Sequence, residues 1–246
     1  MLTSFGADIT AVVVGASGGI GAALADRLAA DPSVARLVAF SRTPVQPRGP
    51  ATVAARLDLE REATIAEAAR TAAACGSIRV VVVATGLLHD SAGLAPEKDW
   101  RALDPDKLAR SFQINAIGPA LVAKHFLPLL PRTGKAVLAV VSARVGSIQD
   151  NRLGGWYGYR ASKAALNMIL KTLSVELARK RKEAVCIGLH PGTVDTALSK
   201  PFQGGVRADA LFTPAQSAQR LLAVIDRATP QDSGRIIAWD GTVVPY

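Results

Sequence analysis

Two tyrosines and a lysine stand at the start of an expected helix, in the segment GGWYGYRASKAALNM at 154–168. Tyr159 and Lys163 are four residues apart, so they lie one above the other on one helix face, whereas Tyr157 points elsewhere. A free phenol has a pKa of about 10, too high for proton transfer near neutral pH. A near, partly desolvated ammonium lowers that pKa by stabilising the phenolate. The spacing indicates Tyr159 as a general acid or base; the alternative for an isolated match is an aromatic helix start with a solvated lysine.

A glycine-rich turn follows the first apolar run, in ITAVVVGASGGIGAALADRLA at 9–29. Gly15 permits a tight turn, Gly19 lets a phosphate approach the backbone, and Gly21 lets the helix pack on the strand. The N–H groups and positive potential of a helix N-terminus suit a pyrophosphate. The turn therefore predicts a dinucleotide site rather than a plain tight turn. We assign to it Gly15, Ser17, Gly18, Gly19, Ile20 and Gly21.

The adenosine end of the dinucleotide is expected after the second strand, in LVAFSRTP at 37–44. An acid there would bind the 2′-hydroxyl of NAD, but this chain has Ser41 and Arg42 instead. An arginine offers a bidentate grip on a 2′-phosphate, so we expect NADP(H) rather than NAD(H), unless Arg42 is simply solvated. Asp58 and Leu59, after the third strand, are expected at the adenine edge; capping of the next helix is the alternative for Asp58.

The elements that must position these residues are apolar strands alternating with Ala- and Leu-rich helices. Strands are expected at Ile9–Val14, Arg36–Phe40, Thr52–Leu57, Arg79–Ala84, Lys135–Val141, Ala184–Leu189 and Arg235–Trp239. Helices are expected at 19–30, 61–74, 107–130, 158–180 and 214–227. Strands such as VVVVA are apolar throughout, which is typical of strands covered on both faces. We therefore predict an α/β fold with a doubly wound parallel sheet and helices on both faces.

Length and composition suit one domain, 1–246, with a sizeable core, because 49% of the 246 residues are hydrophobic. We expect no membrane span and no secretory signal. Two distant cysteines, Cys75 and Cys186, favour a reduced, cytoplasmic compartment. His89, His125 and His190 are not grouped, so no metal site is expected.

The net charge of +9 raises the question of a nucleic-acid partner. The basic residues are scattered, and their densest cluster, RKRK at 179–182, ends an apolar helix, where cations favour the helix dipole. We therefore expect no nucleic-acid partner. The helices over 111–130 and 158–178 carry more apolar surface than a sheet contact needs, which favours a homodimer or homotetramer over burial under loops.

Four motifs occur in order along nearly the whole chain: GASGGIG, QINAIGP, YRASKAALN and HPGTVDT. In these the sequence resembles the short-chain dehydrogenase/reductase family. Within that family, the segment SARVGSIQDNRLGGWYGYRASKAALNM at 142–168 is similar to the C-factor-like and sniffer-type carbonyl reductases. The resemblance implies a single-domain Rossmann fold with seven strands, and NAD(P)-dependent hydride transfer between a carbonyl and an alcohol. It implies catalysis by Tyr159 and Lys163, helped by Asn115 and a serine. Near the nicotinamide it implies Pro191, Gly192, Val194 and Thr196, besides Tyr159 and Lys163.

Two segments depart from the family pattern. The family serine lies three residues before a glycine, where this chain has Ala143. Ser142 is our candidate for the role, although a one-residue shift on a strand reverses the side chain; Ser147, or no serine, remain alternatives. The family's Asn-rich turn is replaced by VATGLLHD, in which Ala84, Thr85 and Gly86 are still expected to offer backbone groups to the cofactor.

The substrate is expected to be chosen by three loops, near 87–105, 147–157 and 198–213. They contain no strong pattern for an anion or a sugar, which is compatible with a small hydrophobic carbonyl compound. A second hypothesis is an NADP-binding signalling or interaction protein with weak or no catalysis, and Ala143 is the residue that keeps it open.

Overall fold

The computed structural model describes residues 1–246, apart from the side chain of Ala208. Its strands are β1 (Ile9–Val14), β2 (Val34–Ser41), β3 (Thr52–Arg56), β4 (Ile78–Val83), β5 (Ala136–Val141), β6 (Ala184–His190), β7 (Thr193–Val194), β8 (Leu211–Phe212), β9 (Ile236–Ala238) and β10 (Val243–Val244). Over the described residues, eight of them form one sheet in the order β10-β9-β6-β5-β4-β1-β2-β3, and β7 pairs with β8.

The predicted doubly wound α/β sheet is confirmed, with one correction to the strand number. Strands β3 to β9 in this order are parallel to their neighbours, and they correspond to the seven expected strands. The eighth, β10, runs antiparallel to β9 at the edge of the sheet. It was not expected because a two-residue strand leaves too short a pattern in the sequence.

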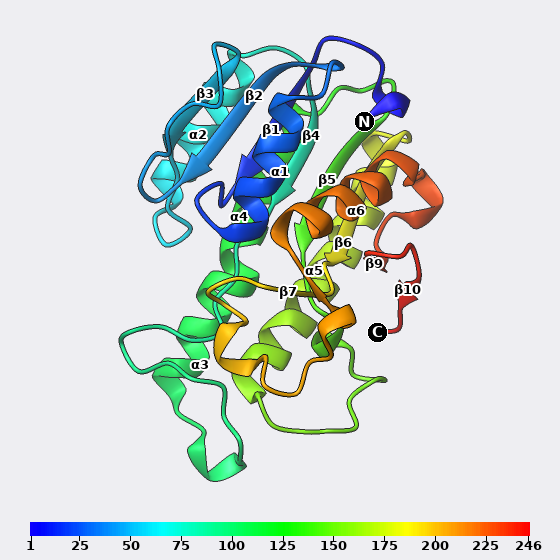
Figure 1. The fold of residues 1–246 in the computed structure, drawn as a ribbon. Coiled ribbons are helices and arrows are strands. Elements are labelled where there is room, and N and C mark those ends of the chain that lie inside the picture. Colours follow the sequence, from blue (N-terminus) through cyan, green and yellow to red (C-terminus); the bar gives the residue numbers. More distant parts are fainter.

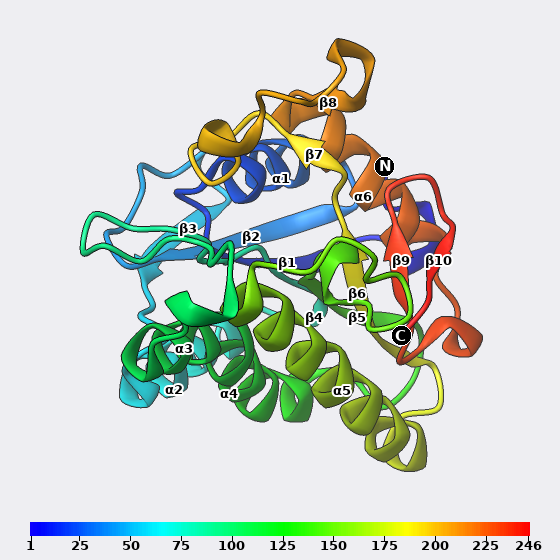
Figure 2. The same ribbon diagram turned by 90° about the horizontal axis from the view of Figure 1, so that it is seen from below.

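Helices cover both faces of the sheet (Figures 1 and 2). One face carries α1 (Gly19–Ala29) and α6 (Pro214–Arg227); the other carries α2 (Glu62–Ala73), α4 (Gly118–Phe126) and α5 (Tyr157–Lys180), with α3 (Pro105–Phe112) beside them. Leu24 and Leu221 are buried in the core under the first face, and Ile65, Val122 and Leu166 in the core under the second. Burial of such a side chain stabilises the fold by about 1.5–3 kcal/mol.

The single helix expected at 107–130 is instead divided into several parts, which is a second correction. Helix α3 ends at Phe112, a π-helical turn spans Gln113–Ile117, and α4 follows. Pro119 explains the break, because it has no N–H to donate to the carbonyl of Asn115 four residues earlier. The consequence is a wider turn of helix at Asn115, one of the expected site residues.

The sheet topology places the expected site residues at the carboxyl ends of the parallel strands. Strand β1 lies between β2 and β4, so the strand order reverses there. Ligands of doubly wound folds bind at the carboxyl ends of the strands at this reversal. The glycine turn follows β1, and the 84–86 turn follows β4. Ser41 is the last residue of β2, and Arg42 comes directly after it.

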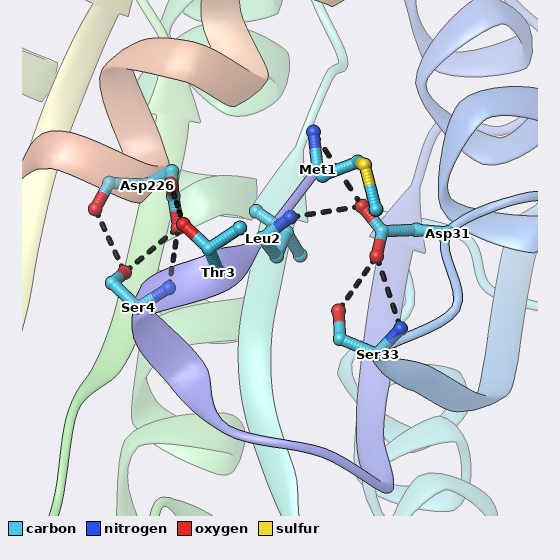
Figure 3. Close-up of polar contacts among 7 residues, drawn as sticks. All are labelled: Met1, Leu2, Thr3, Ser4, Asp31, Ser33 and Asp226. Carbon is cyan, nitrogen blue, oxygen red and sulfur yellow. Dashed lines mark hydrogen bonds and ion pairs between the residues drawn. The ribbon is translucent and has the colours of Figure 1, made fainter.

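At the other end of the sheet, near the amino end of β1, two carboxylates fix the N-terminal segment (Figure 3). Asp31 accepts a hydrogen bond from Leu2 N at 2.9 Å and one from Ser33 Oγ at 2.7 Å. Asp226, on α6, accepts one from Ser4 N at 2.9 Å. Burial alone would raise the pKa of Asp31, but the hydrogen bonds from Ser33 and Leu2 and the N-terminal charge together lower it. This segment therefore closes the end of the sheet that lies away from the site.

Candidate active site

A cavity of about 230 Å³ opens where β1, β2 and β4 end. Ten of the residues expected to bind the cofactor line it: Gly15, Ser17, Gly18, Ser41, Arg42, Asp58, Leu59, Ala84, Thr85 and Gly86. These residues come from four separate segments of the chain, and the fold brings them to one place.

Five further residues line this cavity that the sequence patterns did not single out: Val14, Leu57, Leu87, Arg110 and Ile114. Val14 and Leu57 were expected only as strand residues. Arg110 lies on α3 and Ile114 in the π-helical turn that follows it, so only the packing of this segment brings them to the cavity. Arg110 also forms an ion pair with Glu60.

Close backbone packing shapes the glycine turn. Gly15 has a φ of +93°, and a Cβ there would lie 2.9 Å from Thr85 Cγ2. A Cβ on Gly21 would collide with the carbonyl oxygen of Gly15. Glycine is therefore needed at both positions, at Gly15 for its left-handed backbone and at Gly21 for the approach of α1 to the strand.

The chemistry of this cavity fits a dinucleotide. The Oγ1 atom of Thr85 is buried and has no hydrogen-bond partner within the chain, although Thr85 lines the cavity. Helix α1 begins at Gly19 with Gly18 as its N-cap and no side-chain cap, so N–H groups of its first turn are open to a ligand. Arg42 adds a cation to the same lining. A helix N-terminus, an arginine and a buried hydroxyl are the groups that phosphates and ribose require.

The remaining residues expected near the cofactor do not line this cavity: Gly19, Ile20, Gly21, Tyr159, Lys163, Pro191, Gly192, Val194 and Thr196. Thr196 nevertheless reaches the glycine turn, because a Cβ on Gly19 would lie 2.6 Å from Thr196 Cγ2. Gly192 has a φ of +77°, and a Cβ there would lie 2.6 Å from the ring of Phe212. The segment after β6 thus lies against the start of α1.

Tyr159 and Lys163 share one face of α5, as expected. The Lys163 Nζ atom lies 5.8 Å from the centroid of the Tyr159 ring, and it donates a hydrogen bond to the carbonyl of Val141 at 2.9 Å. A Cβ on Gly86 would lie 3.9 Å from Lys163 Nζ, so the cavity and the pair adjoin at Gly86. Tyr157 begins the same helix two residues before Tyr159.

Burial dominates the ionisation of both groups. Part of the Tyr159 surface is exposed, yet desolvation raises its pKa to about 12. Desolvation lowers the pKa of Lys163 to about 8. The expected lowering of the phenol pKa by the ammonium is therefore not found in the chain alone, because the loss of hydration outweighs a cation at this distance. With this raised pKa, the Tyr159 phenol keeps its proton at neutral pH.

Asn115 is fully buried and fastens the turn after β4. Its Oδ1 atom accepts a hydrogen bond from Leu87 N at 2.8 Å, and its Nδ2 atom donates one to Leu87 O at 2.8 Å. The same Nδ2 atom lies 3.1 Å from Ser162 Oγ on α5. A Cβ on Gly86 would lie 3.9 Å from Asn115 Oδ1, the same distance as from Lys163 Nζ. Asn115 therefore joins α5 to the turn that lines the cavity.

Neither candidate serine has a free hydroxyl. Ser142 Oγ donates to Asn167 Oδ1 at 2.7 Å, so the side chain points toward α5. Ser147 Oγ donates to the carbonyl of Tyr246 at 3.3 Å. The backbone at Ala143 is extended, with φ −152° and ψ 146°, so its methyl group points to the side opposite Ser142.

Among the described side chains, no three His, Cys, Asp or Glu residues gather as metal ligands. In the described part of the chain, none of the helices has the length and apolar character that a membrane crossing requires.

Comparisons with known proteins agree with this architecture. A family model described as short chain dehydrogenase matches residues 9–205. The C-signal protein of Myxococcus xanthus is 39% identical over 150 residues, which are 60% of this chain and 85% of that protein. An uncharacterized oxidoreductase of Schizosaccharomyces pombe is 30% identical over 203 residues, which are 77% of this chain and 76% of that protein.

Solved structures share the fold over almost the entire chain. The NADPH-bound carbonyl reductase from chicken fatty liver has a TM-score of 0.84 at 24% identity, covering 99% of this chain and 97% of that one. The carbonyl reductase Sniffer of D. melanogaster has a TM-score of 0.79 at 24% identity, covering 98% and 100%. At this level of identity the likeness establishes the fold.

Proposed function

The chain belongs to the short-chain dehydrogenase family, a family of oxidoreductases that bind nicotinamide cofactors, and on this premise we propose that it reduces a small carbonyl compound with NADPH. The observation that carries the proposal is the meeting at Gly86 of the dinucleotide cavity with Lys163. Tyr159 and Lys163 share one helix face there. The carbonyl reductases of chicken and D. melanogaster, which share the fold, add support for the substrate class.

The proposed reaction divides the work between the cofactor and Tyr159. Bound reduced nicotinamide supplies the hydride that the carbonyl carbon accepts. Tyr159 donates its phenol proton to the carbonyl oxygen, so the product carries one new C–H and one new O–H bond. Lys163 faces the phenol ring and stabilises the negative charge left on Tyr159. Asn115 holds the turn at Gly86 beside this pair.

The proposal is tested by mixing the protein with NADPH and a panel of aldehydes, ketones and diones, and following the absorbance of the reduced cofactor. We expect turnover on at least one carbonyl. Tyr159→Phe should reduce kcat by at least about 10²-fold, because a positioned general acid contributes that much. Tyr157→Phe is the matched control and should keep kcat within about twofold of the wild type.

NADPH is the proposed cofactor because Ser41 and Arg42 line the cavity where an acid would serve NAD. Arg42→Ala should weaken NADPH binding by about 10-fold to 100-fold, since a charge-assisted hydrogen bond is worth about 1.5–3 kcal/mol. Binding of NADH, which has no 2′-phosphate, should change less than about twofold. Titration calorimetry with both cofactors measures the two changes, and equal weakening would contradict this assignment.

A second candidate function is an NADP-binding protein without turnover. The hydrogen bonds that Ser142 and Ser147 donate elsewhere favour it, because no serine hydroxyl is then directed at a substrate oxygen. The relative in Myxococcus xanthus that bears the name C-signal points in the same direction. Tight NADPH binding with no oxidation by any carbonyl, unchanged by Tyr159→Phe, would select this function.

A further inference from the structure

Glu97 is a buried carboxyl group that the proposed proton transfer does not use. It lies in the 87–105 loop and is only 6% exposed, a degree of burial that acidic side chains reach only with partners. Its Oε2 atom accepts a hydrogen bond from Gly158 N at 3.1 Å. Its main-chain carbonyl accepts one from Trp156 N at 2.5 Å. Both partners belong to the start of α5.

The start of α5 has no cap from its own sequence. Trp156 occupies the N-cap position, and its side chain makes no capping hydrogen bond. Its backbone is left-handed, with φ 54° and ψ 40°, a conformation that a bulky residue adopts only when the surroundings enforce it. The first N–H groups of a helix need acceptors from outside it. Glu97 supplies two acceptors within the first turn of this helix start, one to Trp156 N and one, from 61 residues earlier in the chain, to Gly158 N.

The packing around Gly158 shows that this approach is built into the fold. A Cβ on Gly158 would lie 3.0 Å from Glu97 Oε1 and 3.2 Å from Ser111 Oγ. A larger residue would push the carboxyl group and α3 away from α5. The glycine in the segment WYGY therefore permits the contact with Glu97.

The residues on the two sides of Gly158 contact one another. Tyr159 follows Gly158 directly, and the Trp156 ring lies 6.3 Å from the Tyr159 ring, centroid to centroid. On the other flank, Arg160 donates to the carbonyl of Gly155 at 3.1 Å. The turn that carries the phenol is thus held from the 87–105 loop as well as from within its own segment.

We propose that Glu97 is a positioning residue for Tyr159. From a distant loop of the same chain, Glu97 caps the start of α5 and so sets the position of the Tyr159 phenol beside Lys163. This inference rests on the proposed reductase function for its catalytic part. It assigns to the 87–105 loop a role in building the proton donor, in addition to the role in substrate choice expected from the sequence. The reach of the side chain, rather than its charge, is what the geometry requires.

Three variants separate reach from charge. Glu97→Gln keeps an acceptor at the same length and should keep kcat within about threefold of the wild type. Glu97→Asp keeps the charge but is one methylene too short, and Glu97→Ala removes the group; both should lower kcat by roughly tenfold to hundredfold, because small displacements of a reacting group have effects of that size. The dissociation constant of NADPH should stay within about twofold in all three, since Glu97 does not line the cofactor cavity.

Asp232→Ala is the matched control, because Asp232 also accepts from a main-chain N–H, that of Thr229 at 2.9 Å, and lies outside the cavity and the three loops. It should leave kcat within about twofold. Amide hydrogen exchange gives a readout without catalysis: exchange across 156–160 should accelerate in Glu97→Asp and Glu97→Ala but not in Glu97→Gln or Asp232→Ala. If the wild type reduces no carbonyl, the proposed reductase function is wrong, and the exchange pattern still tests whether Glu97 caps α5. Unchanged exchange and kcat in Glu97→Asp, or equal losses in Glu97→Gln and Glu97→Asp, would overturn the inference.

Discussion

In the proposed reaction, the side chain at position 143 decides whether a serine hydroxyl can help Tyr159 to hold the substrate oxygen. Ser142 donates its proton to Asn167, and the extended backbone at Ala143 turns the next side chain to the opposite face. In the proposed reaction, contact with the substrate oxygen therefore falls to Tyr159, without a serine beside it. A site of this kind retains proton donation but loses one hydrogen bond to the developing charge.

Restoring that hydroxyl should increase activity. Ala143→Ser places a donor on the side of the strand opposite Ser142, and we expect kcat to rise by about tenfold, less than the full effect of an optimised oxyanion donor. Ser142→Ala is the control and should leave kcat within about threefold, because its hydroxyl is bonded to Asn167. Steady-state kinetics on one carbonyl substrate measures both. A loss in Ser142→Ala with no gain in Ala143→Ser would show that Ser142 serves the reaction after all.

Lys163 should make the stability of the protein depend on alkaline pH. Burial lowers its pKa from 10.5 to about 8, so the cost of burying the charge is fully present below pH 8. Between these values the unfolded chain binds a proton that the folded chain has lost, and the free energy of unfolding rises with pH. The full rise is about 3 kcal/mol for a shift of this size.

Urea unfolding of the wild type and of Lys163→Met at pH 7 and pH 9.5 tests this dependence. We expect the free energy of unfolding of the wild type to increase relative to that of Lys163→Met over this interval. Parallel behaviour of the two proteins would mean that Lys163 keeps its charge in the folded state. The interval stops below the pKa of free tyrosine, so Tyr159 does not contribute.

At the scale of elements, the π-helical turn Gln113–Ile117 is the joint between α5 and the cavity at the ends of β1, β2 and β4. Asn115 in this turn pairs with both main-chain groups of Leu87 and also lies within hydrogen-bond distance of Ser162 on α5. In a regular α-helix, the side chains that follow this turn would point in a different direction around the helix axis. The wider turn thus aligns the 84–87 segment with α5.

Removing the Asn115 amide should loosen this joint. Asn115→Ala leaves the N–H and carbonyl of Leu87 without partners, which we expect to cost about 2–4 kcal/mol of unfolding free energy. NADPH affinity should fall with it, because Leu87 and its neighbours line the cavity. The exposed Asn151, which accepts from Gly154 N at 3.1 Å, provides the control, and Asn151→Ala should cost under about 0.5 kcal/mol. Urea unfolding measures the change in stability, and calorimetry measures the change in NADPH affinity. Equal stability of both variants would contradict the role of Asn115 in this joint.

At the scale of the whole molecule, the outer surface of α5 and the turn before α4 exposes apolar side chains. Met168 and Val175 are seven residues apart on α5 and are both exposed, as is Ile117. Two turns of helix separate Met168 from Val175, so they share one face. We propose that a second copy of the chain covers this surface, in agreement with the homodimer or homotetramer expected from the apolar helices.

Sedimentation at micromolar concentration should therefore show a dimer or a tetramer. Met168→Glu should shift the protein toward the monomer, because a charge in an apolar interface is costly. Ala223→Glu introduces the same charge at an exposed position on α6, on the other face of the sheet, and should leave the assembly unchanged. A wild-type monomer under these conditions would contradict the proposal.

The sequence alone determined the layered architecture, and it singled out most of the residues that line the proposed cofactor site. Continuous apolar runs such as Val80–Val83 require burial on both faces, and the glycine spacing at Gly15 to Gly21 has a local physical reason, so neither depends on distant partners. The pairing of Tyr159 with Lys163 is likewise local, because it follows from the helix period.

Only the tertiary structure decided which of these groups are free to act. The direction of the Ser142 hydroxyl depends on Asn167, and the pKa values of Tyr159 and Lys163 depend on burial by segments far along the chain. Glu97 has no local pattern at all, since its partner Gly158 is 61 residues away. Such contacts are set by the packing of α3, α5 and the loops between them, and periodicity in a single segment carries no information about that packing.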